Sequence, residues 1–296
     1  MGNYLGQHFL KNKVKLREIV EALELKDGDV VIEIGPGHGE LTNEIVLKLQ
    51  SLKVENFKII AIEKDREFAS NLKEEFGNNK NIEIIEGDIL KIFPEVTTNY
   101  KIVGNIPYYI TGYLFRILGE LEHKPELIVL LIQKEVAERV CAKKGDMNLL
   151  AASVQFWAEP KIIDYVSRND FEPAPKVDSA IIKLLPVTSQ LLSRLKCNKE
   201  KYYKFIKILF KQPRKTILNN LLLGITDQNI AILSDSMLSD RIAEDKKENE
   251  LQIINKEENK KEIKEEIVEK LKKVGVGPNA RPQNLSVERI IALSNS

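Results

Sequence analysis

The sequence predicts an α/β protein in which a mostly parallel sheet, with an antiparallel hairpin at one edge, precedes a smaller all-helical domain. Between about residues 30 and 185, short apolar runs alternate with helical stretches, which is typical of a parallel sheet built from βα units. After Pro186 only helical spacing remains. We therefore expect two domains, residues 1–185 and 186–296, in a chain too long for a single core.

The expected strands are short apolar segments: 30–34, 58–63, 82–86, 100–104, 126–133, 153–157 and 180–185. Helices are expected between them, at about 13–25, 41–50, 66–76, 111–121 and 134–141. The last two strands follow each other without a long helix, so we expect them to form an antiparallel hairpin at the edge of the sheet.

The helical domain shows apolar residues at helical spacing: Tyr203, Ile206, Leu209, Phe210, Ile217, Leu218, Leu221 and Leu222. A stretch rich in lysine and glutamate follows, and within it Ile263, Ile267, Leu271 and Val274 make a narrow apolar stripe. We expect a solvated amphipathic helix there, with a flexible lead-in over about 244–259 and a charged insertion near 244–262.

Composition limits the class of protein. A hydrophobic content of 43% and a charged content of 30% are typical of a soluble globular protein, and no apolar run reaches the roughly 20 residues of a membrane span. Residues 1–10 lack the features of a secretory or transit signal, so we expect a cytoplasmic location. Cys141 and Cys197 are far apart and are expected to be buried, reduced thiols. A net charge of +1 does not by itself indicate a nucleic-acid partner.

Three strand ends carry groups suited to a nucleoside. The first expected strand runs into Gly35 and Gly37, where the absence of a Cβ lets a ligand approach the backbone. Glu63 ends the second strand, where a carboxylate can accept hydrogen bonds from both ribose hydroxyls, and Asp88 follows the third, where it can accept from an adenine amino group. Together they predict an adenosine-containing ligand, which these residues leave open as NAD or S-adenosylmethionine.

The segment Asn105-Ile106-Pro107-Tyr108 follows the fourth strand and suits chemistry on an adenine amino group. That nitrogen is a poor nucleophile because its lone pair is delocalised, and two acceptors that hold its hydrogens draw it toward tetrahedral geometry. The Asn105 side-chain oxygen and the Ile106 carbonyl can be those acceptors. Pro107 makes the turn rigid, and Tyr108 can stack on the purine. The alternative is a strand-ending turn with an aromatic residue in the core.

Basic residues gather at the start of the helical domain. Between Lys199 and Lys215 there are seven, against the single acid Glu200. This set, which includes Lys211, Arg214 and Lys215, either binds RNA phosphates or forms a solvated face.

Over nearly its whole length the chain resembles the ribosomal RNA adenine N6,N6-dimethyltransferase family, which has a Rossmann-like class I methyltransferase fold. Beyond the glycine turn, Glu63 and Asp88, the resemblance rests on LGQHFL at 5–10, NIPYY at 105–109, FEPAPKVDS at 171–179, RKT at 214–216 and RPQNLS at 281–286. The last two segments favour the bacterial small-subunit enzymes over the large-subunit resistance methylases, which are similar only in the catalytic domain.

The resemblance implies S-adenosylmethionine-dependent dimethylation of two adjacent adenosines near the 3′ end of 16S rRNA, linked to biogenesis of the small ribosomal subunit. We expect a monomer, with no membrane partner because no apolar run is long enough to span one, and with no metal because the sequence shows no ligand cluster. The residues implied to contact the cofactor are His8, Leu10, Gly35, Gly37, Glu63, Asp88 and Asn105. Phe171 would stack on the target adenine opposite Tyr108, its alternative being a core phenylalanine, while Lys211, Arg214 and Lys215 would bind RNA.

Other functions stay open beside this one. They are a large-subunit rRNA adenine methylase, a methyltransferase for a small molecule or protein, and a ribosome-assembly or transcription factor that keeps the fold without essential catalysis. The NIPY segment and the basic helical domain disfavour a small-molecule or protein substrate, and the intact Glu63, Asp88 and Asn105 speak against lost catalysis.

Overall fold

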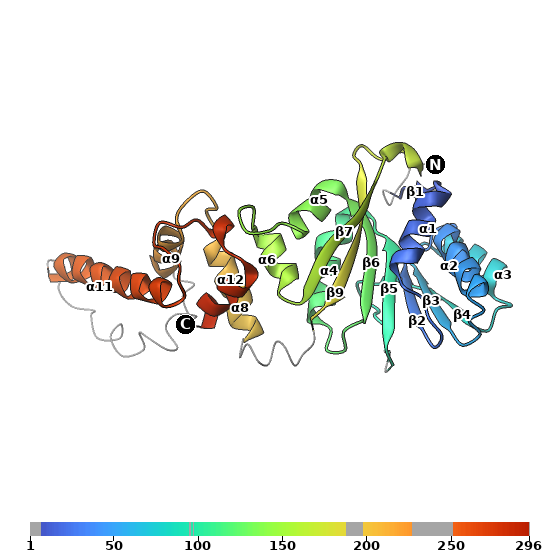
Figure 1. Ribbon diagram of the computed structural model, residues 1–296, viewed down its shortest axis with the longest axis horizontal. Helices are drawn as coiled ribbons and strands as arrows, with labels where there is room; N and C mark the ends of the chain where they lie inside the picture. The colour runs from blue at the N-terminus through green and yellow to red at the C-terminus, as the bar shows by residue number, and fades with distance from the viewer. Residues whose placement is uncertain (1–6, 95, 97, 188–197, 227–250, 296) are drawn as a thin grey trace. The chain divides into compact units, whose positions relative to one another are not determined.

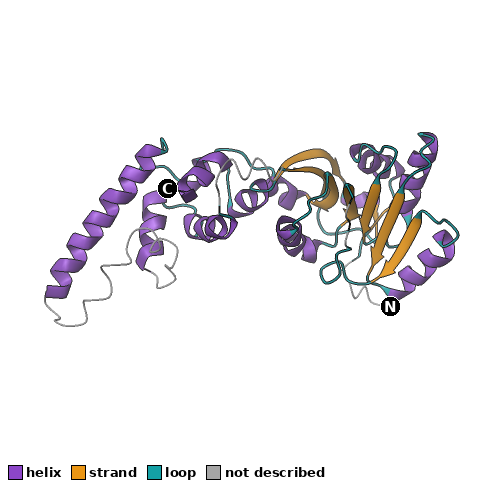
Figure 2. Ribbon diagram, turned by 90° about the horizontal axis from the view of Figure 1, so that it is seen from below, coloured by secondary structure: helices purple, strands orange, loops and turns teal. Residues whose placement is uncertain are grey.

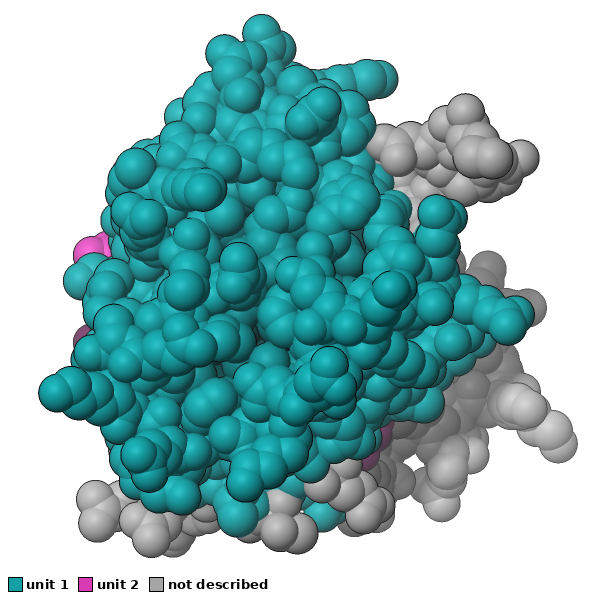
Figure 3. Space-filling model, turned by 90° about the vertical axis from the view of Figure 1, so that its right-hand side faces the viewer, with its two compact units in different colours: residues 1–141, 157–186 teal, residues 142–156, 187–296 magenta. Residues whose placement is uncertain are grey.

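The computed structural model describes residues 7–94, 96, 98–187, 198–226 and 251–295. The chain divides into two compact units: residues 1–141 with 157–186, and residues 142–156 with 187–296. Figure 3 shows one face of the first unit, coloured teal. The segment 142–156 is thus grouped with the second unit, although it precedes the last strands of the sheet.

A seven-stranded sheet forms the centre of the first unit (Figure 1). Its order is β4 (Ile82–Glu86), β3 (Lys58–Glu63), β2 (Val30–Ile34), β5 (Tyr100–Asn105), β6 (Leu127–Gln133), β9 (Ser179–Pro186) and β7 (Ala158–Val166). The first five strands are parallel, and β9 runs antiparallel to both β6 and β7. The predicted fold class, a mostly parallel sheet with an antiparallel hairpin at one edge, is confirmed.

Helices pack on both faces of this sheet (Figure 2). They are α1 (Lys13–Ala22), α2 (Glu40–Ser51), α3 (Arg66–Phe76), α4 (Thr111–Glu120) and α5 (Lys134–Val140). Side-chain caps fix where α1 and α3 begin, because Asn12 accepts hydrogen bonds from the first-turn N–H groups of α1 and Asp65 does the same for α3. Apolar residues of α1, α2 and α3 bury one face of the strands in a continuous core.

The predicted strand at 153–157 is wrong. Those residues lie in and just after α6 (Leu149–Gln155), a helix that Asn148 caps by accepting from the Ala151 N–H at 3.0 Å. The edge strand is β7 instead, which exposes alternate side chains, among them Glu159 and Lys161. Because an edge strand is partly solvated, it lacks the continuous apolar run by which the buried strands were recognised.

Two short strands escaped the sequence analysis. β1 (Phe9–Leu10) pairs antiparallel with β8 (Phe171–Glu172) and ties the N-terminal segment to the loop before β9.

The two cysteines were expected to be buried. Cys141 is half-buried instead, and Cys197 lies outside the described residues.

The described part of the second unit is helical, as expected. It contains α6, α8 (Lys199–Leu209), α9 (Ile217–Thr226), α11 (Leu251–Lys273) and α12 (Val287–Asn295). Phe156 stacks on Tyr202 with ring centroids 4.2 Å apart, and the Tyr202 hydroxyl donates to the Ala152 carbonyl, so α6 and α8 share a core. On α11, Ile267 and Leu271 are buried.

The expected insertion near 244–262 falls outside the described residues as far as 250 and then enters α11. Within the described ranges, every helix is too short or too polar to span a membrane.

Candidate active site

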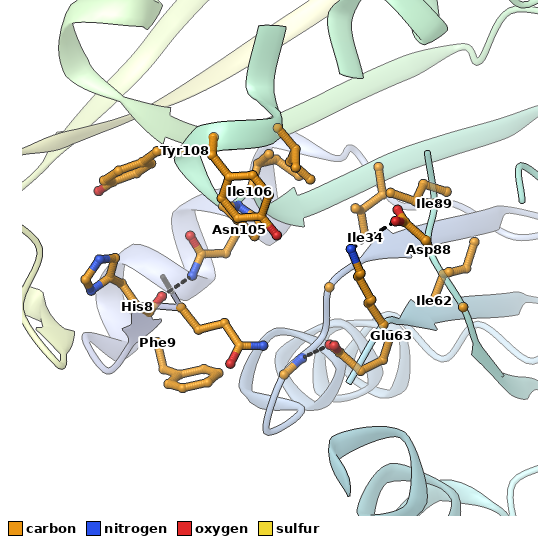
Figure 4. A pocket seen from close by; sticks show the side chains of 18 residues that line it. His8, Phe9, Ile34, Ile62, Glu63, Asp88, Ile89, Asn105, Ile106 and Tyr108 are labelled. Atoms are coloured by element: carbon orange, nitrogen blue, oxygen red, sulfur yellow. Dashed lines mark hydrogen bonds and ion pairs between the residues drawn. The ribbon is translucent and has the colours of Figure 1, made fainter. Parts of the chain in front are cut away.

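A cavity lies at the carboxyl ends of β2, β3 and β5, and residues of the N-terminal segment also line it (Figure 4). The parallel register pairs Ile34 with both Ile62 and Gly104, so the residues that follow these strands converge. The predicted site residues that line the cavity are His8, Gly35, Gly37, Glu63, Asp88, Asn105, Ile106, Pro107 and Tyr108. In Figure 4, His8, Asn105 and Tyr108 lie on one side, while Glu63 and Asp88 lie on the other.

The glycine turn presents bare backbone to this cavity. Gly35 and Gly37 have φ values of +65° and +59°, in the left-handed region that favours glycine. A Cβ built on Gly35 would meet no atom within 4 Å, whereas one built on Gly37 would lie 2.6 Å from Cε1 of Phe9. The chain therefore leaves open space beside Gly35 and closes the space above Gly37 with the Phe9 ring.

Glu63 is a buried carboxylate held by the backbone. Its Oε2 accepts from the Gly37 N–H at 3.0 Å, and its Oε1 accepts from the Asp65 N–H at 2.8 Å. A carboxylate oxygen has two lone pairs, so each oxygen can accept a further hydrogen bond from a ligand hydroxyl. The glycine turn and the acid at the end of β3 thus form one connected element.

Asp88 is fixed from two directions. Its carboxylate forms an ion pair with Lys64 at 3.0 Å and accepts from the Leu90 N–H at 3.1 Å. Burial acts to raise the pKa of Asp88, but the hydrogen bonds from Lys64 and Leu90 outweigh it and hold the pKa below its usual value. Asp88 is therefore an ionised acceptor at neutral pH.

Asn105 ends β5, and its side-chain amide nitrogen donates to the His8 carbonyl at 2.7 Å. The side-chain oxygen is thereby turned away from His8 and remains an acceptor. Ile106 is buried and donates its N–H to the Leu131 carbonyl at 3.0 Å. Among the described residues, none donates a hydrogen bond to the carbonyl oxygen of Ile106. Two acceptors thus lie on consecutive residues of a rigid turn.

Tyr108 stands next to these acceptors. Its hydroxyl shares a 2.8 Å hydrogen bond with Ser179, and its ring centroid lies 5.9 Å from that of His8. Burial raises the pKa of Tyr108 above its ordinary value. The phenol is therefore neutral and anchored at its hydroxyl end.

The structure does not bring two predicted site residues to the cavity. Leu10 and Phe171 are Cα partners in the β1–β8 pair, and their side chains are only 3% and 6% exposed within the hydrophobic core. Neither lines the cavity. In the second unit, Lys211, Arg214 and Lys215 are all exposed.

The sequence analysis missed the role of Phe9 in this site. Its ring lines the cavity and packs on His38, with ring centroids 4.2 Å apart. The signal was present, since Phe9 lies between His8 and Leu10 in a segment already selected.

The second missed residue is Glu33, an acid inside the apolar strand β2. It is 1% exposed, its Oε2 accepts from the Thr42 hydroxyl at 2.6 Å, and its Oε1 has no partner. Burial raises the pKa of Glu33 to about 7. An acid in a buried strand is an unusual position and could have been noticed from the sequence.

Within the described ranges, no three histidine, cysteine or acidic side chains are grouped so as to hold a metal ion.

Comparison with known proteins identifies the family. The family model described as "Ribosomal RNA adenine dimethylase" matches residues 3–259. The chain is 38% identical over 234 residues to "Ribosomal RNA small subunit methyltransferase A" of Dehalococcoides mccartyi, covering 78% of this chain and 77% of that protein. It is 37% identical over 247 residues to the protein of the same name from Rippkaea orientalis, covering 78% and 87%.

Solved structures show the same fold. A dimethyladenosine transferase from Plasmodium falciparum is similar with a TM-score of 0.74 and 27% identity, over 96% of this chain and 95% of that one. The 23S rRNA methyltransferase ErmE is similar with a TM-score of 0.65 and 24% identity, over 97% and 98%. The family of this chain is shown by the matching family model and by the identity to relatives over more than two thirds of their length. The chain belongs to the ribosomal RNA adenine dimethylase family.

Proposed function

We propose that this enzyme transfers methyl groups from S-adenosylmethionine to N6 of two adjacent adenosines near the 3′ end of small-subunit 16S rRNA, two groups to each adenosine. The relatives named as small-subunit methyltransferases support this ribosomal subunit over the large one. The observation that carries the chemistry is the anchored amide of Asn105, whose oxygen is left as an acceptor beside the Ile106 carbonyl.

The residues of the cavity suit an adenosine-containing cofactor. Bare backbone at Gly35 leaves open space for the methionine part, and the second lone pairs of Glu63 can accept from the ribose hydroxyls. Asp88, ionised at the far side, can accept from the adenine amino group. When bound, S-adenosylmethionine supplies a methyl group activated for transfer.

The chain's own residues then prepare the target nitrogen. Oδ1 of Asn105 and the carbonyl oxygen of Ile106 accept the two amino hydrogens, which draws the nitrogen lone pair out of conjugation with the ring. Pro107 keeps the turn rigid, and the Tyr108 ring stacks on the purine with its hydroxyl anchored to Ser179. Once methylated the nitrogen is acidic and loses a proton to water, so no strong general base is needed. The remaining hydrogen can be held in the same way for a second transfer.

We further propose that the first unit is the catalytic, cofactor-binding part and that the second unit binds RNA through Lys211, Arg214 and Lys215. Their exposure supports this role, because phosphate contacts need accessible cations. The core position of Phe171 supports the alternative interpretation of that residue, a core phenylalanine, and we leave it out of the proposed base site.

The test offers purified enzyme and methyl-labelled cofactor to separately isolated, unmethylated small and large ribosomal subunits. Mass analysis of digested RNA should find dimethyladenosine at two adjacent positions of the small-subunit RNA and no label in the large subunit. Labelling of the large subunit, or monomethyladenosine as the sole product, would contradict the proposal. A parallel reaction with Asn105→Ala controls for contaminating activity.

A further inference from the structure

Two tyrosines stand exposed at the edge of the candidate active site. Tyr109 lines the cavity and lies in the short 3-10 helix Tyr108–Ile110, yet 62% of its surface is exposed. Tyr113 follows in the first turn of α4 and is 51% exposed. The 3-10 helix continues directly into α4, and residues one helical turn apart are neighbours on the surface, so we infer that the two exposed side chains lie close together at the edge of the cavity.

These two side chains differ from the other described tyrosines. Tyr100, Tyr108, Tyr165, Tyr202 and Tyr203 each have a hydrogen-bond partner for the hydroxyl. Within the described part of the chain, the hydroxyls of Tyr109 and Tyr113 have none, and no aromatic ring packs on either of theirs. Neither the fold nor its hydrogen-bond network therefore accounts for two large aromatic side chains at this place.

Cations flank the pair. Lys64, which also lines the cavity, has a half-exposed side chain, and its pKa is raised mainly by Asp88 and to a lesser degree by Tyr109. Arg116 lies three residues beyond Tyr113 on α4, and 69% of its side chain is exposed. It forms a 3.0 Å ion pair with Glu120, but such an exposed pair contributes little and leaves the guanidinium accessible.

Exposed aromatic rings beside cations are typical of surfaces that bind single-stranded nucleic acid, where bases stack on the rings and phosphates meet the charges. Resting on the proposed function, we propose that Tyr109 and Tyr113 form a stacking platform for the nucleotide next to the target adenosine, with Arg116 contacting its phosphate. The platform begins at Tyr109 in the cavity wall. When the target adenosine turns out of the RNA into the cavity, the base next to it would therefore come to lie near Tyr109 and Tyr113. Since the proposed substrate has two adjacent adenosines, one can rest there while the other is methylated.

The kinetic test uses Tyr113, which does not line the cavity. Removing one aromatic side chain on which a base stacks weakens nucleic-acid binding. Tyr113→Ala should therefore raise the apparent KM for RNA by about 5-fold to 100-fold. The kcat should change less than about twofold, and cofactor affinity measured by calorimetry should stay as in wild type. Tyr113→Phe should restore the wild-type KM because the ring alone stacks. Tyr165→Ala, which removes an exposed tyrosine on the edge strand β7, is the matched control.

Three outcomes of these measurements would overturn the proposal. They are a wild-type KM in Tyr113→Ala, an equal loss in Tyr113→Phe, and a changed cofactor affinity. The first would show that RNA does not touch this side chain, the second that its hydroxyl rather than its ring matters, and the third that it acts through the cofactor.

A second experiment requires binding but no methyl transfer. Two RNA fragments are used, one with 5-iodouridine in place of the nucleotide before the target adenosine and one with it in place of the nucleotide after. Each fragment is irradiated together with the enzyme and S-adenosylhomocysteine. Mass spectrometry should find the crosslink on the peptide with Tyr109 and Tyr113, and Tyr109→Ala combined with Tyr113→Ala should abolish it. A crosslink elsewhere, or none from RNA that binds, would overturn the platform. Failure of the wild type to methylate small-subunit RNA would instead overturn the proposed function.

Discussion

The side-chain amide of Asn105 donates a 2.7 Å hydrogen bond to the backbone carbonyl of His8, a residue 97 positions earlier in the chain. His8 is held in turn by a 2.8 Å contact between its Nδ1 and the Pro173 carbonyl and by the neighbouring pairing of β1 with β8. The N-terminal segment thus determines which end of the Asn105 amide faces away from it. This is why an asparagine, with a donor and an acceptor on one planar group, suits the position.

Replacing Asn105 should separate chemistry from binding. Asn105→Ala removes one of the two proposed acceptors, so single-turnover methyl transfer should fall by roughly 100-fold or more, the scale seen for one oriented polar group at a reacting centre. RNA affinity should stay near that of wild type. The matched control is Asn99→Ala at the opposite end of β5, where the side chain only donates to Glu126 at 2.7 Å. Near-normal transfer by Asn105→Ala would refute the mechanism.

Glu63 should act on the cofactor. Glu63→Ala removes the proposed acceptor of the ribose hydroxyls, so cofactor affinity measured by calorimetry should weaken by about 1–3 kcal/mol. Glu67→Ala, an exposed acid in the first turn of α3, serves as the control and should bind normally. If Glu63→Ala bound the cofactor as tightly as wild type, Glu63 would be a structural anchor of the glycine turn and nothing more.

The candidate site could be located from sequence because parallel strands carry their carboxyl ends to one edge. Glu63 and Asn105 end strands whose apolar runs were recognised, and Asp88 lies just beyond a third, so their convergence required no knowledge of side-chain packing. The bond from Asn105 to His8 could not be foreseen in this way, since it joins segments that meet only through the β1–β8 pair.

Burial was the property that local motifs did not reveal. Leu10 and Phe171 lie in motifs shared with the family, yet a motif does not state which side of a two-residue strand faces the core. The missing strand β7 has a similar cause, because its alternating exposure differs from the apolar runs of the inner strands. For α6, Asn148 is a residue type that favours the start of a helix, whereas the apolar residues after it were interpreted as a strand.

Gly37 should be more sensitive to substitution than another glycine in the same backbone region. Gly28→Ala and Gly37→Ala share the strain of a positive φ, +83° and +59°, but only the Cβ at Gly37 meets an obstacle, Cε1 of Phe9 at 2.6 Å. Gly37→Ala should therefore lower the free energy of unfolding by about 1–3 kcal/mol more than Gly28→Ala does, the usual range for overpacking. Denaturant unfolding measures both. Equal losses would mean that Phe9 moves aside at no cost.

The basic residues of the second unit should act on all RNA sequences alike. Lys211→Ala with Lys215→Ala should weaken RNA binding and lower the slope of log affinity against log salt by about 2, because each phosphate contact releases roughly one counterion. Lys261→Ala with Lys264→Ala, which removes two exposed lysines of α11, is the matched control for net charge. A salt slope equal to that of wild type would show that Lys211 and Lys215 belong to a solvated face.

Glu33 should make stability depend on pH. Burial raises its pKa to about 7 in the folded protein, against an ordinary value of 4.5, so the folded state retains a proton that the unfolded chain loses. Below about pH 4.5 both states are protonated and the burial has no ionic cost. As the pH rises through 4.5 the unfolded state ionises first, and the folded protein loses stability until Glu33 ionises near pH 7. The full loss is about 3 kcal/mol, from 1.36 kcal/mol per pH unit of difference.

Glu33→Gln removes this titration while preserving an acceptor for the Thr42 hydroxyl. Relative to wild type, the variant should therefore gain up to about 3 kcal/mol of unfolding free energy between pH 4.5 and pH 8, with most of the gain complete by pH 7. Denaturant unfolding at intervals of half a pH unit measures the difference, and Glu159→Gln on the exposed edge of β7 should show none. A constant difference between Glu33→Gln and wild type across this range would mean that Glu33 keeps its ordinary pKa despite its burial among apolar neighbours in β2.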